Sequence, residues 1–234
     1  MLKINNLTKV YDGFRAVDDL TLHIERGQIY GFIGHNGAGK TTTIKCCTGI
    51  LGFEQGTIEI DGIDIVKNPI ECKKKMAYIP DNPDLYEFLP GIKYINFIAD
   101  VYGVSQSERE ERTAKYGDMF DITKDLAQPI SAYSHGMKQK LALVAAFVHK
   151  PELIIMDEPF VGLDPKASFL LKEEMRSHCN NGGAIFFSTH VLEVAEKLCD
   201  RIAIIKQGRL VTSGTMEAVK GNTSLEDVFL ELEG

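Results

Sequence analysis

The chain has 234 residues, enough for one sizeable domain or for one domain with an inserted lobe. Hydrophobic residues make up 44% of it and charged residues 25%, and 26 lysines and arginines against 33 aspartates and glutamates leave a net charge of -7. This balance is ordinary for a globular protein, and it argues against nucleic acid as the main partner, because phosphate-backbone binding relies on clustered basic side chains.

The first third of the chain consists mostly of predicted strands. Its predicted elements are strands at 17–24, 28–33 and 76–79, a helix at 42–51 and a hairpin at 56–65. The first strand alternates apolar and polar residues, as a half-buried strand does. The hairpin is expected to turn at Asp61-Gly62, a pair typical of two-residue turns.

The pattern changes after Pro80, where a turn-rich segment, 81–90, precedes a largely helical region at 91–120 and a strong helix pattern at 136–150. Strands and helices then alternate, with strands at 153–156, 184–188 and 202–205 and helices at 165–180, 192–198 and 224–232. Consecutive apolar positions in these strands indicate parallel strands buried on both faces. We therefore expect a parallel α/β core, an early antiparallel β portion and a helical insertion at about 83–150.

Cysteines and apolar runs add two expectations. The five cysteines are odd in number and form no CxxC pair, so reduced buried thiols are expected, with neither a disulfide framework nor a zinc site. The first residues do not resemble a signal peptide, and no apolar run approaches the ~18 residues that span a bilayer. The longest run, 141–148, fits a buried helix face. Any work at a membrane is therefore expected to need a partner.

Residues 34–41, GHNGAGKT, lie between a predicted apolar strand and a predicted helix. Gly34, Gly37 and Gly39 allow a tight turn that presents backbone N–H groups to phosphate oxygens, and the helix directs its positive end at the same place. Lys40 supplies a charge for the β- and γ-phosphates, and the Thr41 hydroxyl is a ligand for Mg²⁺. The loop predicts nucleotide binding and leaves a kinase, a GTPase and a transport ATPase open.

The sequence LIIMDE supplies candidate acidic groups at the end of a buried strand. Asp157 is placed to hold Mg²⁺ through its water shell, and Glu158 to act on the attacking water as a general base. His190 follows another core strand, at the edge where ligands of parallel sheets collect, so its imidazole is a candidate partner of the γ-phosphate.

Ser134 and Gly136 open the helix that leads toward Asp157. A serine at a helix start is a common N-cap, so capping is one interpretation. The other is that two short side chains allow close approach to a phosphate. The spacing alone does not decide between them.

Taken together, these motifs resemble a nucleotide-binding subunit of an ATP-binding-cassette (ABC) transporter over essentially the whole chain. GHNGAGKT resembles the Walker A loop of the family, LIIMDEP its Walker B strand with the catalytic glutamate, and YSHGMKQ its signature motif. VGLDP resembles its D-loop and STH its switch histidine, while Tyr11 stands where an aromatic ring meets adenine. The pairing of YSxGMKQ with a closing SLEDVFLEL resembles exporters of the ABC-2 type.

The resemblance implies a P-loop NTPase (RecA-like) parallel-sheet core with an N-terminal antiparallel β subdomain and an inserted α-helical subdomain. Core and β subdomain would comprise 1–82 and 151–234, and the helical subdomain 83–150. It further implies an ATP-hydrolysing subunit that powers transport through a separate membrane-spanning permease, at the cytoplasmic face of the cell membrane. A complete site would need a head-to-tail homodimer or heterodimer, with ATP on the loop of one subunit capped by the signature motif of the other.

By the same resemblance, Glu158 and His190 are the catalytic residues, and Thr41, Asp81 and Asp157 are the Mg²⁺ ligands. The ATP-binding positions are Tyr11, Val17, Gly34, His35, Asn36, Gly37, Ala38, Gly39, Lys40, Thr41, Thr42, Asp81, Ser134, Gly136, Asp157 and Asp164. Two departures stand out. Asp81 replaces the usual glutamine, and Tyr133, His135 and Met137 stand in a signature that usually reads LSGGQ, with Ser134 and Gly136 kept.

Other interpretations stay open at this level. The aromatic residues Tyr86, Phe88, Tyr94 and Phe97 suit either local packing of the helical lobe or a groove that receives a short helix of a membrane-spanning partner. The rival functions are a soluble ABC-type ATPase that remodels a protein or nucleic-acid complex, a small-molecule kinase and an import subunit.

Overall fold

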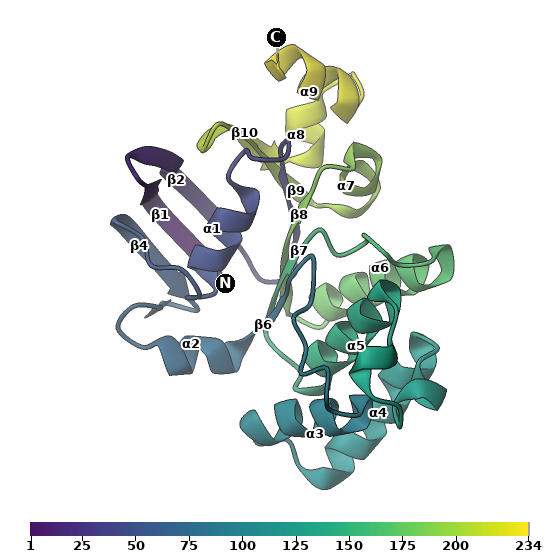
Figure 1. Ribbon diagram of the computed structural model, residues 1–234. Coiled ribbons are helices and arrows are strands. Elements are labelled where there is room, and N and C mark those ends of the chain that lie inside the picture. The colour runs from purple at the N-terminus through teal and green to yellow at the C-terminus, as the bar shows by residue number, and fades with distance from the viewer. Residues whose placement is uncertain (234) are drawn as a thin grey trace.

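Two sheets organise the protein, whose computed structural model describes residues 1–233 (Figure 1). Gly234, the last residue of the predicted core, lies outside the described residues. The first sheet is antiparallel, in the order β2-β1-β4-β5. Its strands are β1 (Leu2–Tyr11), β2 (Phe14–Ile24), β4 (Gln55–Ile60) and β5 (Ile63–Asp64).

The second sheet has the order β10-β9-β3-β8-β7-β6, and its strands are parallel except for β10 at one edge. They are β3 (Ile29–Ile33), β6 (Met76–Ile79), β7 (Leu153–Asp157), β8 (Ala184–Thr189), β9 (Arg201–Lys206) and β10 (Arg209–Thr215). The predicted fold class, a parallel α/β core with an early antiparallel β portion and added helices, is confirmed.

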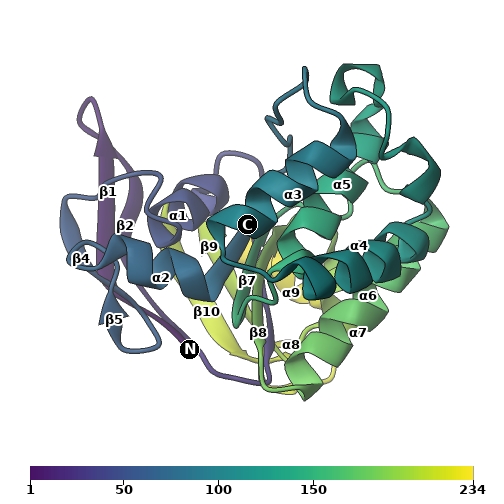
Figure 2. The ribbon, with the colours of Figure 1, turned by 90° about the horizontal axis from the view of Figure 1, so that it is seen from below.

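The helices are α1 (Lys40–Cys47), α2 (Pro69–Lys75), α3 (Gly91–Val101), α4 (Gln106–Met119), α5 (His135–Val148), α6 (Pro165–Asn180), α7 (Leu192–Leu198), α8 (Met216–Lys220) and α9 (Leu225–Glu233). Figure 1 shows α3, α4 and α5 gathered at the lower right of the central sheet, away from the antiparallel sheet. Figure 2 shows the same separation from below, with β1, β2 and β4 on one side and α4, α6 and α7 on the other.

Both faces of the parallel sheet are buried, which explains why its strands are apolar at consecutive positions. In β8, Ala184 and Phe186 face a core shared with α1 and the antiparallel sheet, while Ile185 and Phe187 face a second core shared with α5, α6 and α7. Every residue of the run 141–148 is buried, and all but Ala145 belong to that second core, as the pattern of the run predicts. The two cores hold the carboxyl ends of β3, β7 and β8 in fixed register.

Several elements match their sequence pattern and others do not. The hairpin at 56–65 is confirmed, with Asp61 (φ 53°) and Gly62 (φ 78°) forming its two-residue turn. The helical region at 91–120 is two helices, because Gly103 (φ 68°) ends α3 and Ser105 caps α4. The patterns of β1, α2, β10 and α8 predicted no element. In β1 the register shifts between Ile4 and Leu7, so the alternation that marks a strand is broken.

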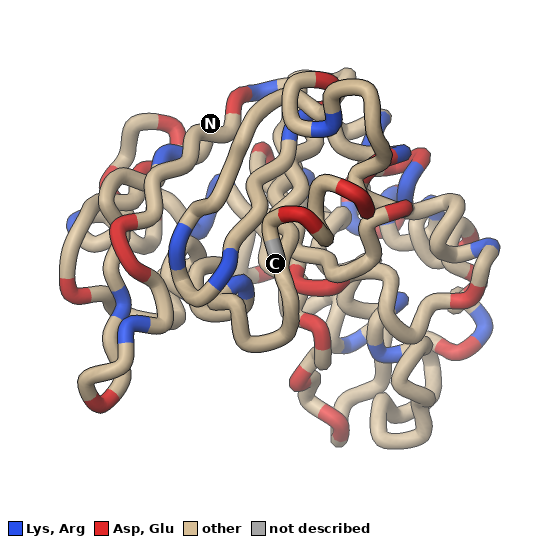
Figure 3. Tube along the Cα trace, turned by 90° about the horizontal axis from the view of Figure 1, so that it is seen from above, with Lys and Arg blue, Asp and Glu red and all other residues tan. Residues whose placement is uncertain are grey.

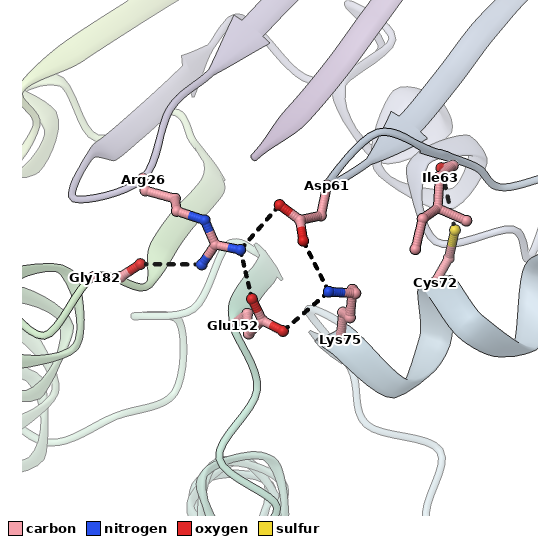
Figure 4. A network of polar contacts seen from close by, with 7 residues as sticks. All are labelled: Arg26, Asp61, Ile63, Cys72, Lys75, Glu152 and Gly182. Carbon is pink, nitrogen blue, oxygen red and sulfur yellow. Dashed lines mark hydrogen bonds and ion pairs between the residues drawn. The ribbon is translucent and has the colours of Figure 1, made fainter.

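A network of four charged side chains joins the two sheets (Figure 4). Arg26 Nη2 lies 2.9 Å from Asp61 and 2.6 Å from Glu152, and Lys75 Nζ lies 2.8 Å from Asp61 and 3.3 Å from Glu152. Asp61 sits in the β4–β5 turn, whereas the other three precede strands of the parallel sheet. The groups are partly exposed, so each pair contributes at most about 1 kcal/mol, but together they fix where the sheets meet.

Lysines and arginines are interspersed with aspartates and glutamates along the trace, as Figure 3 shows. Within the described part of the chain, none of the helices has both the length and the apolar character that crossing a bilayer requires. The five cysteines are buried and free, which confirms the expectation of unpaired thiols.

Candidate active site

The loop between β3 and α1 is shaped by glycines for two different reasons. At Gly34 an added Cβ would lie 2.5 Å from the Ile205 carbonyl oxygen, and at Gly39 it would lie 2.5 Å from the Ala16 carbonyl oxygen. These two glycines are therefore required by the packing behind the loop. Gly37 has open space around it but adopts φ 82°, a left-handed conformation that favours glycine.

The first turn of α1 has no side-chain cap, because its N-cap is Gly39. The N–H groups at a helix start lack intrahelical partners and carry the positive end of the helix dipole, so they suit a phosphate. Lys40 is buried, and its Nζ donates to the carbonyl oxygens of Gly34 at 2.5 Å and His35 at 3.2 Å. Burial lowers the pKa of Lys40, while the Glu158 and Asp157 carboxylates oppose that shift.

The end of β7 holds the two acidic residues in different ways. Asp157 is buried and accepts a hydrogen bond from Ser188 Oγ of the neighbouring strand β8. Glu158 turns away from the strand with φ 47°, uncommon for a residue other than glycine. Its N–H lies 3.1 Å from Ser188 Oγ and 3.2 Å from the Ser188 carbonyl oxygen, and these contacts hold the unusual backbone.

The Glu158 carboxylate lies between a histidine and a lysine. Its Oε1 lies 3.0 Å from His190 Nδ1 and 3.6 Å from Lys40 Nζ. That oxygen is buried and makes no hydrogen bond of acceptable geometry among the described residues. An oxygen in this position is available to accept a hydrogen bond from water, as the acceptor of a general base must be. The sequence predicted His190 as a partner of the γ-phosphate, and the geometry places its imidazole directly beside Glu158.

An aromatic pair stands at the tip of the β1–β2 hairpin. Asp12 (φ 47°) and Gly13 (φ 86°) form a two-residue turn, so Tyr11 and Phe14 are directly opposed across the strands. Both rings are substantially exposed, Tyr11 at 42% and Phe14 at 65%. Exposed rings of this size offer a stacking surface for a planar base.

The cleft in front of the loop has a volume of about 450 Å³. It is lined by Tyr11, Phe14, Ala16, His35, Asn36, Gly37, Gly39, Lys40, Thr41, Thr42, Asp81, Asp157 and Glu158. Residues from the β1–β2 hairpin, the glycine loop and the end of β7 therefore meet in one place, while His190 reaches the cleft only through its contact with Glu158. Val17, predicted to bind the cofactor, does not line it, because its side chain is fully buried in the core shared with α1.

Phe14, Ala16 and Ser188 are the site residues that the motifs did not reveal. The sequence signal for Phe14 was its position directly after Asp12-Gly13, which makes it the cross-strand neighbour of Tyr11. Strand alternation turns Val17 inward, so Ala16 takes the cleft position instead.

The hard-oxygen groups in the cleft fit Mg²⁺ rather than a softer ion. Thr41, Asp81 and Asp157 bring a hydroxyl and two carboxylates, the ligand types Mg²⁺ prefers. Mg²⁺ commonly keeps several waters and binds substrate phosphates beside one or two carboxylates. Burial raises the pKa of Asp81, and the Asp157 and Glu158 carboxylates raise it further, so a cation here would relieve like-charge repulsion.

The residues of the signature motif lie outside this cleft. Ser134 caps α5, accepting a hydrogen bond from Met137 N at 3.3 Å, so the capping interpretation is confirmed. At Gly136 an added Cβ would lie 2.6 Å from the Gly162 carbonyl oxygen, which leaves no room for a side chain. The absence of a side chain at Gly136 thus has a structural cause, and the short residues also leave the start of α5 open to an approaching group.

Asp164 is likewise engaged within its own chain. Its side chain caps α6 through Ala167 N at 2.8 Å and lies 2.6 Å from Lys140 Nζ. The hydrogen bond from Lys140, with that from Ala167, lowers the pKa of Asp164. This contact joins the segment after Glu158 to α5. The cleft and the signature motif are therefore connected within one chain.

Known sequences resemble the chain over nearly its full length. The family model described as ABC transporter matches residues 17–161. EcsA of Bacillus subtilis (strain 168), an ABC-type transporter ATP-binding protein, is 35% identical over 237 residues, covering 99% of this chain and 96% of EcsA. The linearmycin resistance ATP-binding protein LnrL of the same organism is 34% identical over 215 residues, covering 92% of this chain and 69% of LnrL.

Solved structures agree with the observed fold. A structure described as the ATP binding subunit of an ABC transporter has a TM-score of 0.96 and 36% identity, with each chain covered completely. The ATP-binding cassette MJ0796, described as dimeric and bound to ADP and Pi, has a TM-score of 0.84 over 92% of this chain and 99% of its own. At 21% identity, this second likeness concerns the fold alone.

Proposed function

The chain belongs to the ABC transporter family as an ATP-binding subunit with ATPase activity, and on that premise we propose that it powers export through a separate membrane-spanning permease. The observation that carries the hydrolytic part of the proposal is the buried Glu158 oxygen between His190 and Lys40, beside the phosphate-binding loop. A kinase would need to deliver the phosphoryl group to an acceptor other than water, whereas this oxygen suits the activation of water.

The proposed hydrolysis divides its tasks among the cleft residues and His190. The loop amides and Lys40 hold the phosphates, Glu158 accepts the proton of the attacking water, and His190 positions Glu158 and the γ-phosphate. Tyr11 and Phe14 stack on the base. Thr41, Asp81 and Asp157 would hold Mg²⁺, which neutralises phosphate charge when bound.

A head-to-tail dimer completes the proposed site, with Ser134 and Gly136 of one subunit facing the nucleotide on the loop of the other. Two features support this arrangement. The start of α5 lies outside the cleft of its own chain, and the structurally similar MJ0796 is described as dimeric. The nucleotide would then bridge two subunits, and hydrolysis would remove the phosphate that joins them.

The test of the hydrolytic assignment is Glu158→Gln. The variant is expected to bind ATP with near-normal affinity, to lose at least a hundredfold in turnover and to accumulate as an ATP-bound dimer in size-exclusion chromatography. Glu152→Gln is the matched control, because Glu152 lies in the ion-pair network and not in the cleft. Near-normal hydrolysis by Glu158→Gln would refute the assignment of the base.

The permease is proposed to dock on an aromatic cluster formed by Tyr86, Phe88, Tyr94 and Phe97. The ring of Tyr86 lies 6.1 Å from Phe88, 6.2 Å from Tyr94 and 5.7 Å from Phe97. Tyr86, Phe88 and Phe97 are 50%, 80% and 44% exposed, which is a large apolar area to leave in water without a partner.

The same segment is tied to the signature helix. Glu87 forms an ion pair with Lys138 of α5, and its carbonyl oxygen accepts a hydrogen bond from Ser131 N at 2.9 Å. A partner helix pressing on Tyr86 and Phe88 would thus act directly on the start of α5. This connection gives the proposed docking surface a route to the nucleotide.

The docking proposal is tested with the double variant Tyr86→Ala/Phe88→Ala. Basal ATPase is expected to stay within about twofold, since neither residue lines the cleft, while co-purification with the permease and transport-coupled ATPase fall. Unchanged assembly would place the contact elsewhere.

A subunit that docks on a permease in this way would work at the cytoplasmic face of the membrane. The two cassettes of the dimer would be identical or different. The division of the chain into subdomains at 82/83 and 150/151 stays a prediction.

Export is favoured over import by the names of the relatives, since LnrL is a resistance protein. An import subunit would use the same cleft and the same dimer. Inverted vesicles that contain the complex distinguish the two directions. ATP-driven uptake of a substrate into these vesicles indicates export, and its ATP-driven release from them indicates import.

A further inference from the structure

Helix α2 and the turn before it carry a surface that nothing in the ATPase cycle uses. Val66 and Ile70 are 68% and 72% exposed, among the most exposed large apolar residues of the described chain. Around them stand Lys67, Lys73 and Lys74, all exposed. We call these five residues the α2 face.

The apolar residues of the α2 face are exposed because hydrogen bonds fix the turn and the helix in this orientation. Asp64 Oδ1 accepts hydrogen bonds from Val66 N at 2.9 Å and Lys67 N at 3.1 Å, and the Asp64 carbonyl oxygen accepts one from Asn68 N at 2.9 Å. On the inner side of the helix Cys72 is buried and donates from Sγ to the Ile63 carbonyl oxygen (Figure 4). The turn therefore holds Val66 outward in a fixed position.

The lysines of the α2 face are largely uncommitted. Lys73 and Lys74 form no ion pair with any described residue, and Lys67 lies 3.6 Å from Asp64 while its side chain stays 78% exposed. Glu71 is the acidic residue between them. Lys67, Ile70 and Lys74 border one hollow of the surface, so charge and apolar area lie side by side.

A local excess of positive charge is notable in a chain whose net charge is -7. Lysines next to exposed aliphatic side chains match the headgroup region of an anionic bilayer, where the ammonium groups meet phosphates and the aliphatic groups enter the acyl boundary. A protein partner would more often offer complementary acidic side chains and cover the aliphatic residues with its own core.

The position of α2 agrees with a membrane contact. Figure 1 shows α2 and α3 at the lower side of the molecule, and Figure 2, seen from below, shows both in front. α3 carries Phe97, part of the aromatic cluster proposed above for the permease. If that cluster faces a membrane-spanning partner, α2 faces the bilayer that surrounds it, and to this extent the inference rests on the proposed function.

We propose that the α2 face is a membrane-contact surface that binds anionic phospholipid headgroups. The full chain is tested by co-sedimentation with vesicles of phosphatidylglycerol and phosphatidylcholine, compared with phosphatidylcholine alone. Preferential sedimentation with the anionic vesicles is expected, and it should weaken with added salt. No preference for the anionic vesicles would overturn the proposal.

Variants locate the contact. Lys67→Gln/Lys73→Gln/Lys74→Gln is expected to reduce binding to anionic vesicles at least tenfold, because each lysine near such a surface is worth about fivefold. Val66→Ser/Ile70→Ser should reduce it severalfold at unchanged net charge. The control Lys124→Gln/Lys150→Gln/Lys197→Gln removes three exposed positive charges elsewhere and should bind within twofold of the wild type.

Three results bear on the outcome. An equal loss in the control triple variant would attribute binding to overall charge and overturn the proposal. Unchanged vesicle binding in the α2 variants would also overturn it, and lost co-purification of the permease in the same variants would identify the face as a protein contact. All variants should keep wild-type ATPase activity in solution, so a failure of the proposed hydrolysis is recognised independently of vesicle binding.

Discussion

Helices α1 and α5 both start at a motif expected to meet phosphate, yet their first turns are completed in opposite ways. α1 follows Gly39, which offers no side chain to its N–H groups. α5 follows Ser134, whose hydroxyl already accepts from Met137 N. The start of α1 therefore has no acceptor from a capping side chain, whereas one N–H at the start of α5 already has an acceptor within the chain. We infer that a single subunit binds nucleotide through α1, and that α5 contributes only when a second subunit supplies it.

The largest test of this contrast is Lys40→Ala. Its ammonium is buried at the start of α1, so its removal takes away the strongest charge for the phosphates. ATP affinity in isothermal titration is expected to fall at least tenfold, and hydrolysis at least a hundredfold, on the order of 3 kcal/mol of transition-state stabilisation. Lys45→Ala, in the same helix but outside the cleft, is the control. Unchanged ATP affinity in Lys40→Ala would contradict the proposed role of α1 in nucleotide binding.

Gly136→Ala addresses the other helix. The new Cβ would meet the Gly162 carbonyl oxygen at 2.6 Å, so the start of α5 must shift. Hydrolysis is expected to fall about tenfold, while ATP affinity of the monomeric subunit stays within twofold, because α5 lies outside that cleft. Affinity measured at dilutions that prevent dimerisation separates the two effects. An equal loss of monomer affinity would contradict the division of roles.

Ser134→Ala sharpens the comparison through stability. Loss of the cap should lower the free energy of unfolding by about 1 kcal/mol in urea denaturation, whereas Ser134→Asn should restore most of it. Thr215→Ala, which removes the cap of α8 far from the motif, serves as a reference for an ordinary cap. A loss of hydrolysis in Ser134→Ala that exceeds the loss in Thr215→Ala measures what the serine adds beyond capping.

The smallest expected effect concerns Asp81. Because the pKa of Asp81 is raised above its ordinary 3.8, its ionised form is disfavoured in the folded chain, and the carboxyl costs stability at pH values above the raised pKa. Asp81→Asn should therefore increase the free energy of unfolding at pH 7, by less than about 1 kcal/mol for an exposed side chain. The gain should shrink as the pH falls toward 3.8, where both states become protonated.

Denaturation at several pH values without nucleotide or Mg²⁺ measures this difference. Asp84→Asn, in the same segment, controls for the general loss of a negative charge. A stability decrease at pH 7 in Asp81→Asn would show that the carboxylate is favoured in the cleft. With Mg²⁺ and ATP present the sign is expected to reverse, because the cation then compensates the charge.

The sequence predicted those features that local physics determines. Apolar strands, the Asp61-Gly62 turn and the glycine loop each depend on a few neighbouring residues, and each is confirmed. Features that depend on distant residues were not predictable. Ser188 reaches Asp157 only because β7 and β8 are neighbours, and the left-handed backbone of Glu158 depends on the same serine.

Val17 shows a different limit. Family resemblance predicted that Val17 contacts the nucleotide. Alternate residues of a strand face opposite sides, so Phe14 and Ala16 line the cleft while Val17 faces the core. For Ser134 the sequence left two interpretations open, and the structure confirms capping without testing the contact across a dimer. The roles of the site residues stay predictions until the variants above are measured.

The inward orientation of Lys40 has a consequence for the choice among adenine nucleotides. Its ammonium donates to the carbonyl oxygens of Gly34 and His35 and lies 3.6 Å from Glu158 Oε1, so a ligand must compete with these acceptors to draw it away. A monophosphate ends too early to compete for it, whereas a longer polyphosphate tail carries its charge to the lysine. The folded-back side chain would then favour di- and triphosphates over a monophosphate, even where the base and ribose fit equally well.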